Sequence, residues 1–148
     1  RRFTLGRQDL EARLKRLNPK KQKAAAGEAH LWIGMLYGAT KGHQRGGIHL
    51  RNARRLLNDR PDILLALGHY NRERGDGGHA IELYKLASDA SGSPPSAHLA
   101  LGKLAIIRKQ RKLAKLALER YLRDAPEAES AGWARRQVDQ LEGRKDDR

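Results

Sequence analysis

The fold is decided by residues 61–94, which read PDILLALGHYNRERGDGGHAIELYKLASDASGSP. Apolar side chains recur in this stretch at α-helical spacing on both sides of a break: Ile63, Leu64 and Leu67 before it, and Ile81, Tyr84 and Ala87 after it. The break is Gly-Asp-Gly-Gly at 75–78, a composition that interrupts helices. The stretch therefore predicts two helices joined by a tight turn.

The same pattern recurs with a period of 34 residues. An apolar residue followed by glycine stands at Ile33-Gly34, Leu67-Gly68 and Leu101-Gly102. Twelve residues after each glycine comes a small residue, at Gly46, Ala80 and Ala114. Two further columns follow at sixteen and nineteen residues: Leu50, Tyr84 and Leu118, then Ala53, Ala87 and Tyr121. Four columns in one register indicate a true repeat, with small residues where paired helices approach closely.

This repeat resembles the tetratricopeptide repeat (TPR) family, or its shorter-motif SEL-like relatives, with units at 27–60, 61–94 and 95–128. The glycine-heavy first turn at 42–47 leans toward the relatives, and the third turn at 108–111 contains no glycine. The resemblance implies an all-α, right-handed α-solenoid of three helix-turn-helix repeats. We expect Ser93 to cap the first helix of the third unit, with Pro94 and Pro95 in its first turn, and Pro61 to start the second unit in a similar way.

The two ends of the chain differ from the repeats. Residues 1–26 form a basic segment in which an amphipathic helix is predicted over 8–17, either as a cap or as part of an upstream repeat. Residues 129–142 place alanine, valine and leucine on one stripe and charges elsewhere, as a capping helix requires. Residues 143–148 are predicted to be a charged, disordered tail.

The resemblance also implies a concave groove lined by the first helix of each unit. Its ligand-facing positions give an aliphatic floor and a charged rim here: Leu31, Met35, Leu65, His69, Arg72, Glu73, Leu99, Lys103 and Ile106. Such a surface suits an amphipathic helix or an extended peptide. The other interpretation is that the leucines pack within the array or under a terminal helix. The lysine and asparagine set that TPR domains use to hold a C-terminal carboxylate is absent from the matching positions.

The 148-residue chain carries 31 Lys and Arg against 17 Asp and Glu, a net charge of +14. Five basic residues of the third unit form a candidate anion-binding patch: Arg108, Lys109, Arg111, Lys112 and Lys115. Such a patch attracts phosphates, so a basic nucleic-acid-binding module is the alternative function, and an acidic membrane surface is a further partner. With only seven aromatic residues, several at repeat core positions, bases would find few stacking platforms.

Other chemistry finds little support in the sequence. The chain has no cysteine, its six histidines lack zinc-site spacing, and no phosphate-binding loop or catalytic triad is recognisable. We therefore expect no enzyme activity, no cofactor, no metal and no small-molecule substrate. The favoured function is a protein-interaction scaffold that binds a partner peptide or helix, as one subunit of a larger assembly.

The residues say less about the location of the protein. No apolar run is long enough to span a bilayer, which leaves the cytoplasm, the periplasm, or attachment to a membrane through a segment outside this chain. The abundance of arginine, alanine, leucine and glycine indicates a GC-rich bacterial genome.

Overall fold

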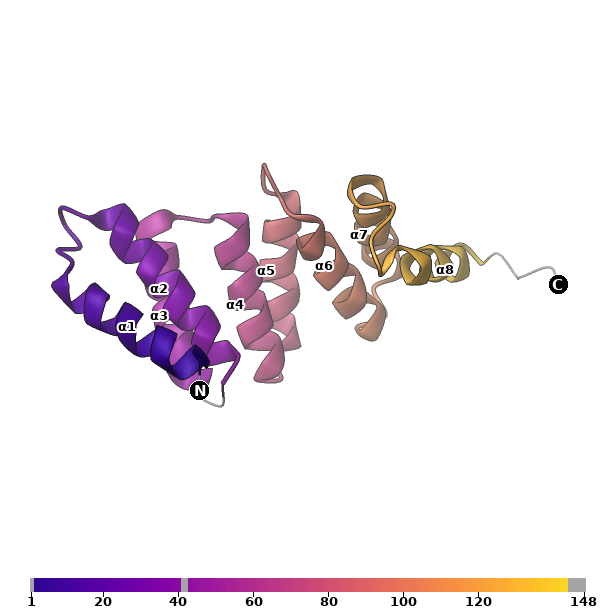
Figure 1. Cartoon of the computed structure of the whole chain (residues 1–148). Helices are drawn as coiled ribbons and strands as arrows, with labels where there is room; N and C mark the ends of the chain where they lie inside the picture. The colour runs from indigo at the N-terminus through magenta and orange to yellow at the C-terminus, as the bar shows by residue number, and fades with distance from the viewer. Residues whose placement is uncertain (1, 41–42, 144–148) are drawn as a thin grey trace.

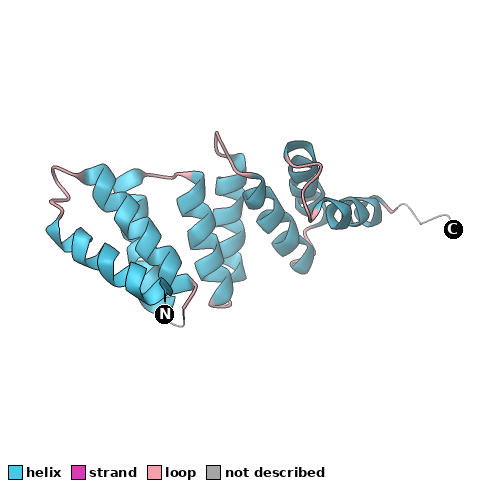
Figure 2. Ribbon diagram, in the orientation of Figure 1, coloured by secondary structure: helices cyan, strands magenta, loops and turns pink. Residues whose placement is uncertain are grey.

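The computed structural model describes residues 2–40 and 43–143 of the chain. Within these residues it has eight α-helices and no β-strand (Figure 1, Figure 2). The helices are α1 (Arg2–Arg16), α2 (Lys23–Gly38), α3 (His43–Leu57), α4 (Pro61–Glu73), α5 (Gly77–Asp89), α6 (Pro95–Ile107), α7 (Arg111–Asp124) and α8 (Ala131–Glu142). The predicted all-α fold class is confirmed.

The helices pack against one another in chain order. The most extensive associations are the pairs α2–α3, α4–α5 and α6–α7, which are the three predicted helical hairpins. Helix α1 packs on α2, and α8 packs on α7. Figure 1 shows the helices following one another across the molecule, from α1 to α8.

The 34-residue period is present in the helix boundaries. The first helices α4 and α6 begin at Pro61 and Pro95, where the missing amide proton of proline costs no hydrogen bond. The second helices α3, α5 and α7 begin at His43, Gly77 and Arg111, again 34 residues apart. The sequence period therefore corresponds to one helical hairpin.

In each hairpin, a side chain of the second helix packs directly against a glycine of the first helix. A Cβ built on Gly34 would lie 2.7 Å from the Leu50 side chain, and one on Gly102 would lie 2.5 Å from the Leu118 side chain. At Gly68 the added atom would overlap the Tyr84 ring. In all three cases the partner stands sixteen residues further on, so the predicted close approach of the paired helices is confirmed.

The turns share a left-handed backbone conformation. Gly75, between α4 and α5, has φ +79°, and Lys109, at the equivalent place between α6 and α7, has φ +58°. The connections after α3 and α5 show the same correspondence, with φ +63° at Asn58 and +71° at Gly92. Glycine accepts this conformation freely, whereas a side chain strains it.

Replacing Lys109 with glycine is therefore expected to raise the free energy of unfolding by about 0.5–1 kcal/mol, because it relieves the left-handed strain by more than it costs in chain entropy. The matched control is Lys85→Gly in the middle of α5, which should lower that free energy by about 1 kcal/mol. Urea denaturation followed by circular dichroism measures both. A loss of stability in both variants would contradict the argument.

Three local predictions are wrong. Helix α1 begins at Arg2 rather than at residue 8, and it packs on α2 through residues on both sides of that predicted start. Tyr37 donates a 2.7 Å hydrogen bond to Glu11, and the Arg7 guanidinium lies 4.4 Å from the centre of the Tyr37 ring. Ser93 does not cap α6, since Pro94 is the N-cap residue and no side chain bonds there.

The third wrong prediction concerns the first turn, which the glycine content places at residues 42–47. Residue 42 lies outside the described residues, but residues 43–47 are helical and open α3. A Cβ on Gly46 would lie 3.0 Å from the Cβ of Tyr37, and one on Gly47 would overlap the Tyr70 ring. These two glycines therefore admit neighbouring helices instead of forming a turn.

Helix α8 covers the last hairpin. Its Ala131 and Ala134 are buried, and Ala134 packs with Leu118 and Tyr121 of α7. Arg136 stands 34 residues after Gly102, and this position of α8 is exposed to solvent. Since α8 has an arginine where α2, α4 and α6 have glycine, it is not shaped to receive a second helix in the same way. Of the predicted tail, residues 144–148 lie outside the described residues.

Candidate partner-binding groove

A groove of about 680 Å³ lies between α2, α4 and the start of α6. Its lining includes Met35, Gly38, Ala39, Asp62, Leu65, His69, Arg72, Glu73 and Ser96. Five of the nine predicted groove residues, Met35, Leu65, His69, Arg72 and Glu73, are thus brought together at one site. Hereafter we call this site the groove.

The floor of the groove is apolar, and its α2 side has little side-chain bulk. Gly34 and Gly38 have no side chain and Ala39 adds a single methyl group, which leaves room above them. Met35 is 45% exposed, and half-buried Leu65 also packs on the core of the next hairpin. A flexible thioether beside a fixed leucine can adapt to different apolar side chains.

The rim of the groove is polar. Asp62 forms a 2.6 Å ion pair with Arg60, and Arg60 also pairs with Glu28, which ties α4 to α2. The His69 Nδ1 lies 2.7 Å from the Tyr84 hydroxyl. Burial, and then Arg72, lower the pKa of His69, so the ring is neutral at neutral pH. Burial raises the pKa of Tyr84 to about 12, so its hydroxyl keeps the proton that it donates.

The other four predicted groove residues do not line the groove. Leu31 is in the core, where it packs with Leu50 and Ile63. Leu99 and Ile106 pack against the cluster formed by α7 and α8, and the Lys103 ammonium lies 5.4 Å from the centre of the Trp133 ring. The groove ends at the start of α6 because α8 uses the same face of α6.

Trp32 is a surface residue that the sequence analysis missed. It lies on α2, three residues before Met35, and is 54% exposed. The repeat contained a signal, because the equivalent positions hold Ala66 and Ala100, and a tryptophan in a column of small residues has no pocket within the repeat. Exposed tryptophans are frequent anchors of protein interfaces.

The candidate anion-binding patch is only partly free. The Arg111 guanidinium donates a 3.0 Å hydrogen bond to the Leu141 carbonyl at the end of α8. Lys115 forms ion pairs with Glu142 at 2.9 Å and Glu119 at 3.5 Å, and these raise the pKa of Lys115, with the Glu142 bond as the main cause. The other three, Arg108, Lys109 and Lys112, are exposed.

The structure joins a serine, a histidine and an aspartate that the sequence analysis did not connect. The Ser88 Oγ lies 2.7 Å from the His98 Nδ1, and the His98 Nε2 lies 3.2 Å from the Asp124 Oδ2, beside a polar cavity of about 550 Å³. Burial lowers the pKa of His98, whereas Asp124 opposes the change. This chain of side chains connects α5, α6 and α7.

The geometry of these three residues disfavours nucleophilic catalysis. Ser88 is only 5% exposed, and its Oγ also accepts a 3.3 Å hydrogen bond from Arg120. A nucleophilic serine needs an oxygen that the substrate can reach and that is free to attack. We interpret the three residues as a structural connection between helices.

A pair of histidines links the first hairpin. The His30 and His49 Nδ1 atoms lie 2.9 Å apart, so one ring donates and the other accepts. Burial, then His49 and Arg55, lower the pKa of His30 to about 4, and burial lowers the pKa of His49 while Glu11 opposes it. Protonation would put two N–H groups face to face and break the bond.

Acidification is therefore expected to destabilise the protein. Because the folded pKa of His30 lies below the usual 6.5, the unfolded chain binds more protons as the pH falls from about 6.5 to 4. We expect a loss of about 1–2 kcal/mol, less than the full shift implies, since the ring is partly solvated. Denaturation at several pH values measures this. His30→Gln should flatten the profile, and an unchanged profile in this variant would contradict the role of the histidine pair.

Comparisons with known proteins do not indicate a function for the chain. No protein-family model matches the chain, and no curated protein is found to be similar to it. Over residues 2–40 and 43–143, no group of three His, Asp or Glu side chains is placed to hold a metal ion. None of the helices in that part of the chain combines the length and the apolar character that a membrane span needs.

Proposed function

We propose that the protein is a right-handed α-solenoid of three TPR-like units with a capping helix, and that it acts as a protein-interaction scaffold. The observation that supports this most is the groove, in which positions from three successive units meet at one surface. The repeated helix boundaries and the glycine contacts of each hairpin support the solenoid.

The proposed ligand is a peptide or helix of a partner protein that places apolar side chains on the groove floor. The volume of about 680 Å³ lies in the range of sites that enclose bulky groups. The neutral His69 ring and the Arg72 and Glu73 side chains at the rim would select polar groups that flank the apolar anchor. Trp32 would extend the contact along α2.

A selection from a random peptide library on the whole chain, followed by fluorescence anisotropy, tests this proposal. Met35→Asp should weaken the selected peptides by about tenfold or more, because it puts a charge on the groove floor. Ile107→Asp is the matched control, since Ile107 is 73% exposed and lies outside the groove. Equal losses in both variants, or a loss in neither, would contradict binding in the groove.

The second candidate function is phosphate binding by Arg108, Lys109 and Lys112. No hydrogen bond or ion pair engages these three side chains within the described part of the chain, so they remain available to nucleic acid or to an acidic membrane. Three contacts to duplex DNA would give a slope of about −3 in log affinity against log salt. A salt titration with random DNA and RNA measures it, and no binding at low salt would discard this candidate.

We further propose that the scaffold is not an enzyme. The Ser88–His98–Asp124 chain is the arrangement closest to a catalytic one, and its serine is buried. We expect a fluorophosphonate reagent to leave Ser88 unmodified. Covalent labelling of Ser88, detected by mass spectrometry, would refute this part of the proposal.

A further inference from the structure

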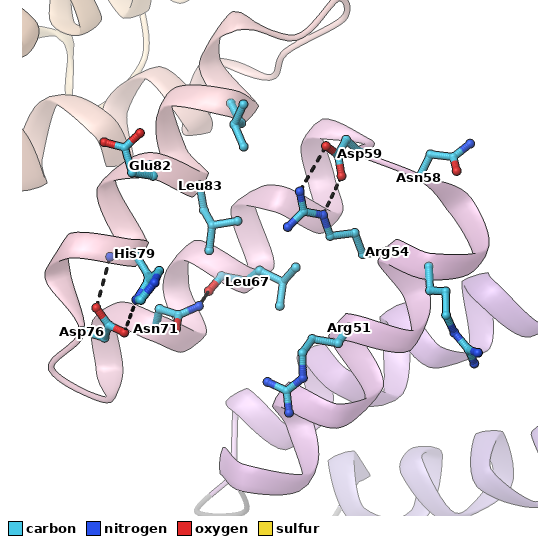
Figure 3. Close-up of a pocket in the computed structure, with 12 residues that line it drawn as sticks. Arg51, Arg54, Asn58, Asp59, Leu67, Asn71, Asp76, His79, Glu82 and Leu83 are labelled. Carbon is cyan, nitrogen blue, oxygen red and sulfur yellow. Dashed lines mark hydrogen bonds and ion pairs between the residues drawn. The ribbon is translucent and has the colours of Figure 1, made fainter.

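A second cavity, of about 1080 Å³, opens between α3 and α5, which are the second helices of the first two hairpins (Figure 3). Leu67 and Asn71 of α4 also contribute to its lining. None of the residues that line it also lines the groove. We call this cavity the cleft, and its role is independent of the function proposed for the groove.

The equivalent interval between α5 and α7 is bridged. There the Arg120 guanidinium forms a 2.5 Å ion pair with Asp89 and also donates to Ser88. The residues 34 positions earlier are Leu86 and Arg55, which cannot make that bridge. Leu86 is consequently 48% exposed at the edge of the cleft. One interval is therefore bridged and holds the smaller cavity of about 550 Å³, whereas the other is unbridged and holds the larger one.

The two walls of the cleft differ in charge. Helix α3 contains four arginines and no acidic residue, and three of the four, Arg51, Arg54 and Arg55, line the cleft. Arg54 is occupied by Asp59 through two hydrogen bonds of 2.5 and 3.1 Å. Figure 3 shows Arg51 extending from α3 with no partner drawn, while Glu82 and Leu83 lie on α5 across the cleft.

We propose that the cleft binds an acidic amphipathic helix of a partner protein. Its carboxylates would pair with Arg51 on the α3 wall, and its aliphatic side chains would cover Leu83 and Leu86 on the α5 wall. The carboxylates would supply the negative charge that Arg51 lacks, and the aliphatic side chains would supply the apolar contact that exposed Leu86 lacks.

Nucleic acid fits this cleft less well. A nucleic acid carries phosphates along its whole length, so Asp76 and Glu82 on the α5 wall would repel those that reach them, whereas a helix can keep its carboxylates on the side that faces α3. Exposed Leu86 would gain nothing from phosphates. Stacking of unpaired bases needs aromatic side chains, and Phe, Tyr and Trp are absent from the residues that line the cleft in the described part of the chain. An amphipathic protein helix satisfies both walls.

Two synthetic helical peptides test this proposal. They share one leucine stripe and differ only in carrying glutamate or lysine beside it, and their binding to the whole chain is measured by fluorescence anisotropy. The glutamate peptide should bind at least about tenfold more tightly than the lysine peptide. Arg51→Glu and Leu86→Asp should each weaken it by about tenfold, whereas the matched control Arg136→Glu, at an exposed position on α8, should not.

A third variant copies the bridge of the next interval into the cleft. Arg55→Asp combined with Leu86→Arg recreates the Asp89–Arg120 pair and should close the cleft, with a loss of binding of about tenfold while circular dichroism stays unchanged. Equal affinity for the two peptides, or affinity unchanged by Arg51→Glu and Leu86→Asp, would overturn the proposal. Random RNA that binds through Arg51 while neither peptide binds would also overturn it, in favour of nucleic acid.

Discussion

Replacing Tyr84 with alanine is expected to lower the free energy of unfolding by about 3–5 kcal/mol, the cost of emptying a large buried aromatic site. Tyr84 is fully buried, and its ring fills the space that Gly68 leaves open between α4 and α5. Tyr84→Phe keeps the ring and loses only the bond to His69, so it should cost about 1 kcal/mol. Urea denaturation followed by circular dichroism separates the two effects.

Two different results at Tyr84 would contradict this prediction, and each would point to a different cause. Equal costs for Tyr84→Phe and Tyr84→Ala would mean that the hydrogen bond, rather than the packed ring, stabilises the second hairpin. Little change in either variant would contradict the central place of Tyr84 in the core. Because a loss of this size approaches the whole stability of a small domain, the alanine variant should also be examined for soluble expression.

The second large effect is expected for Gly68→Ala, which should cost about 1–3 kcal/mol by overpacking the contact with Tyr84. Gly78→Ala is the matched control. Its added Cβ would meet nothing closer than the Asp76 Oδ1 at 3.8 Å, and alanine favours the helix, so this variant should gain up to about 1 kcal/mol.

A double-mutant cycle checks the cause of that effect. If Gly68→Ala is harmful because it collides with Tyr84, its cost should largely disappear in the Tyr84→Ala background, where the ring is absent. An additive pair of losses would instead indicate that residue 68 requires glycine for a reason within α4 itself.

The fold was predictable where one residue type had one physical use. The prolines at 61 and 95 start helices, and Gly68 in a column of glycines marks a close helix contact. The prediction for Gly46 and Gly47 is wrong because glycine both breaks helices and admits close neighbours. The choice between these uses depends on where the Tyr37 and Tyr70 side chains lie in the folded protein, and that placement cannot be read from the sequence.

The site was predictable to a similar degree. The TPR register placed Leu65, His69 and Arg72 on one surface, and the structure groups them. It failed at Leu99 and Ile106, because the period alone does not tell whether a following helix covers a given face. The binding role of the groove residues stays a prediction.

Helix α4 serves as a wall common to the groove and the cleft. It contributes Leu65 and His69 to the former and Leu67 and Asn71 to the latter. At about 100° per residue these pairs project from opposite sides of the helix. If a ligand in the groove displaces α4 and thereby changes the affinity of the cleft for its ligand, the ligand in the cleft must change the affinity of the groove by the same factor. The shared helix α4 would then make the occupancy of each site depend on the ligand in the other.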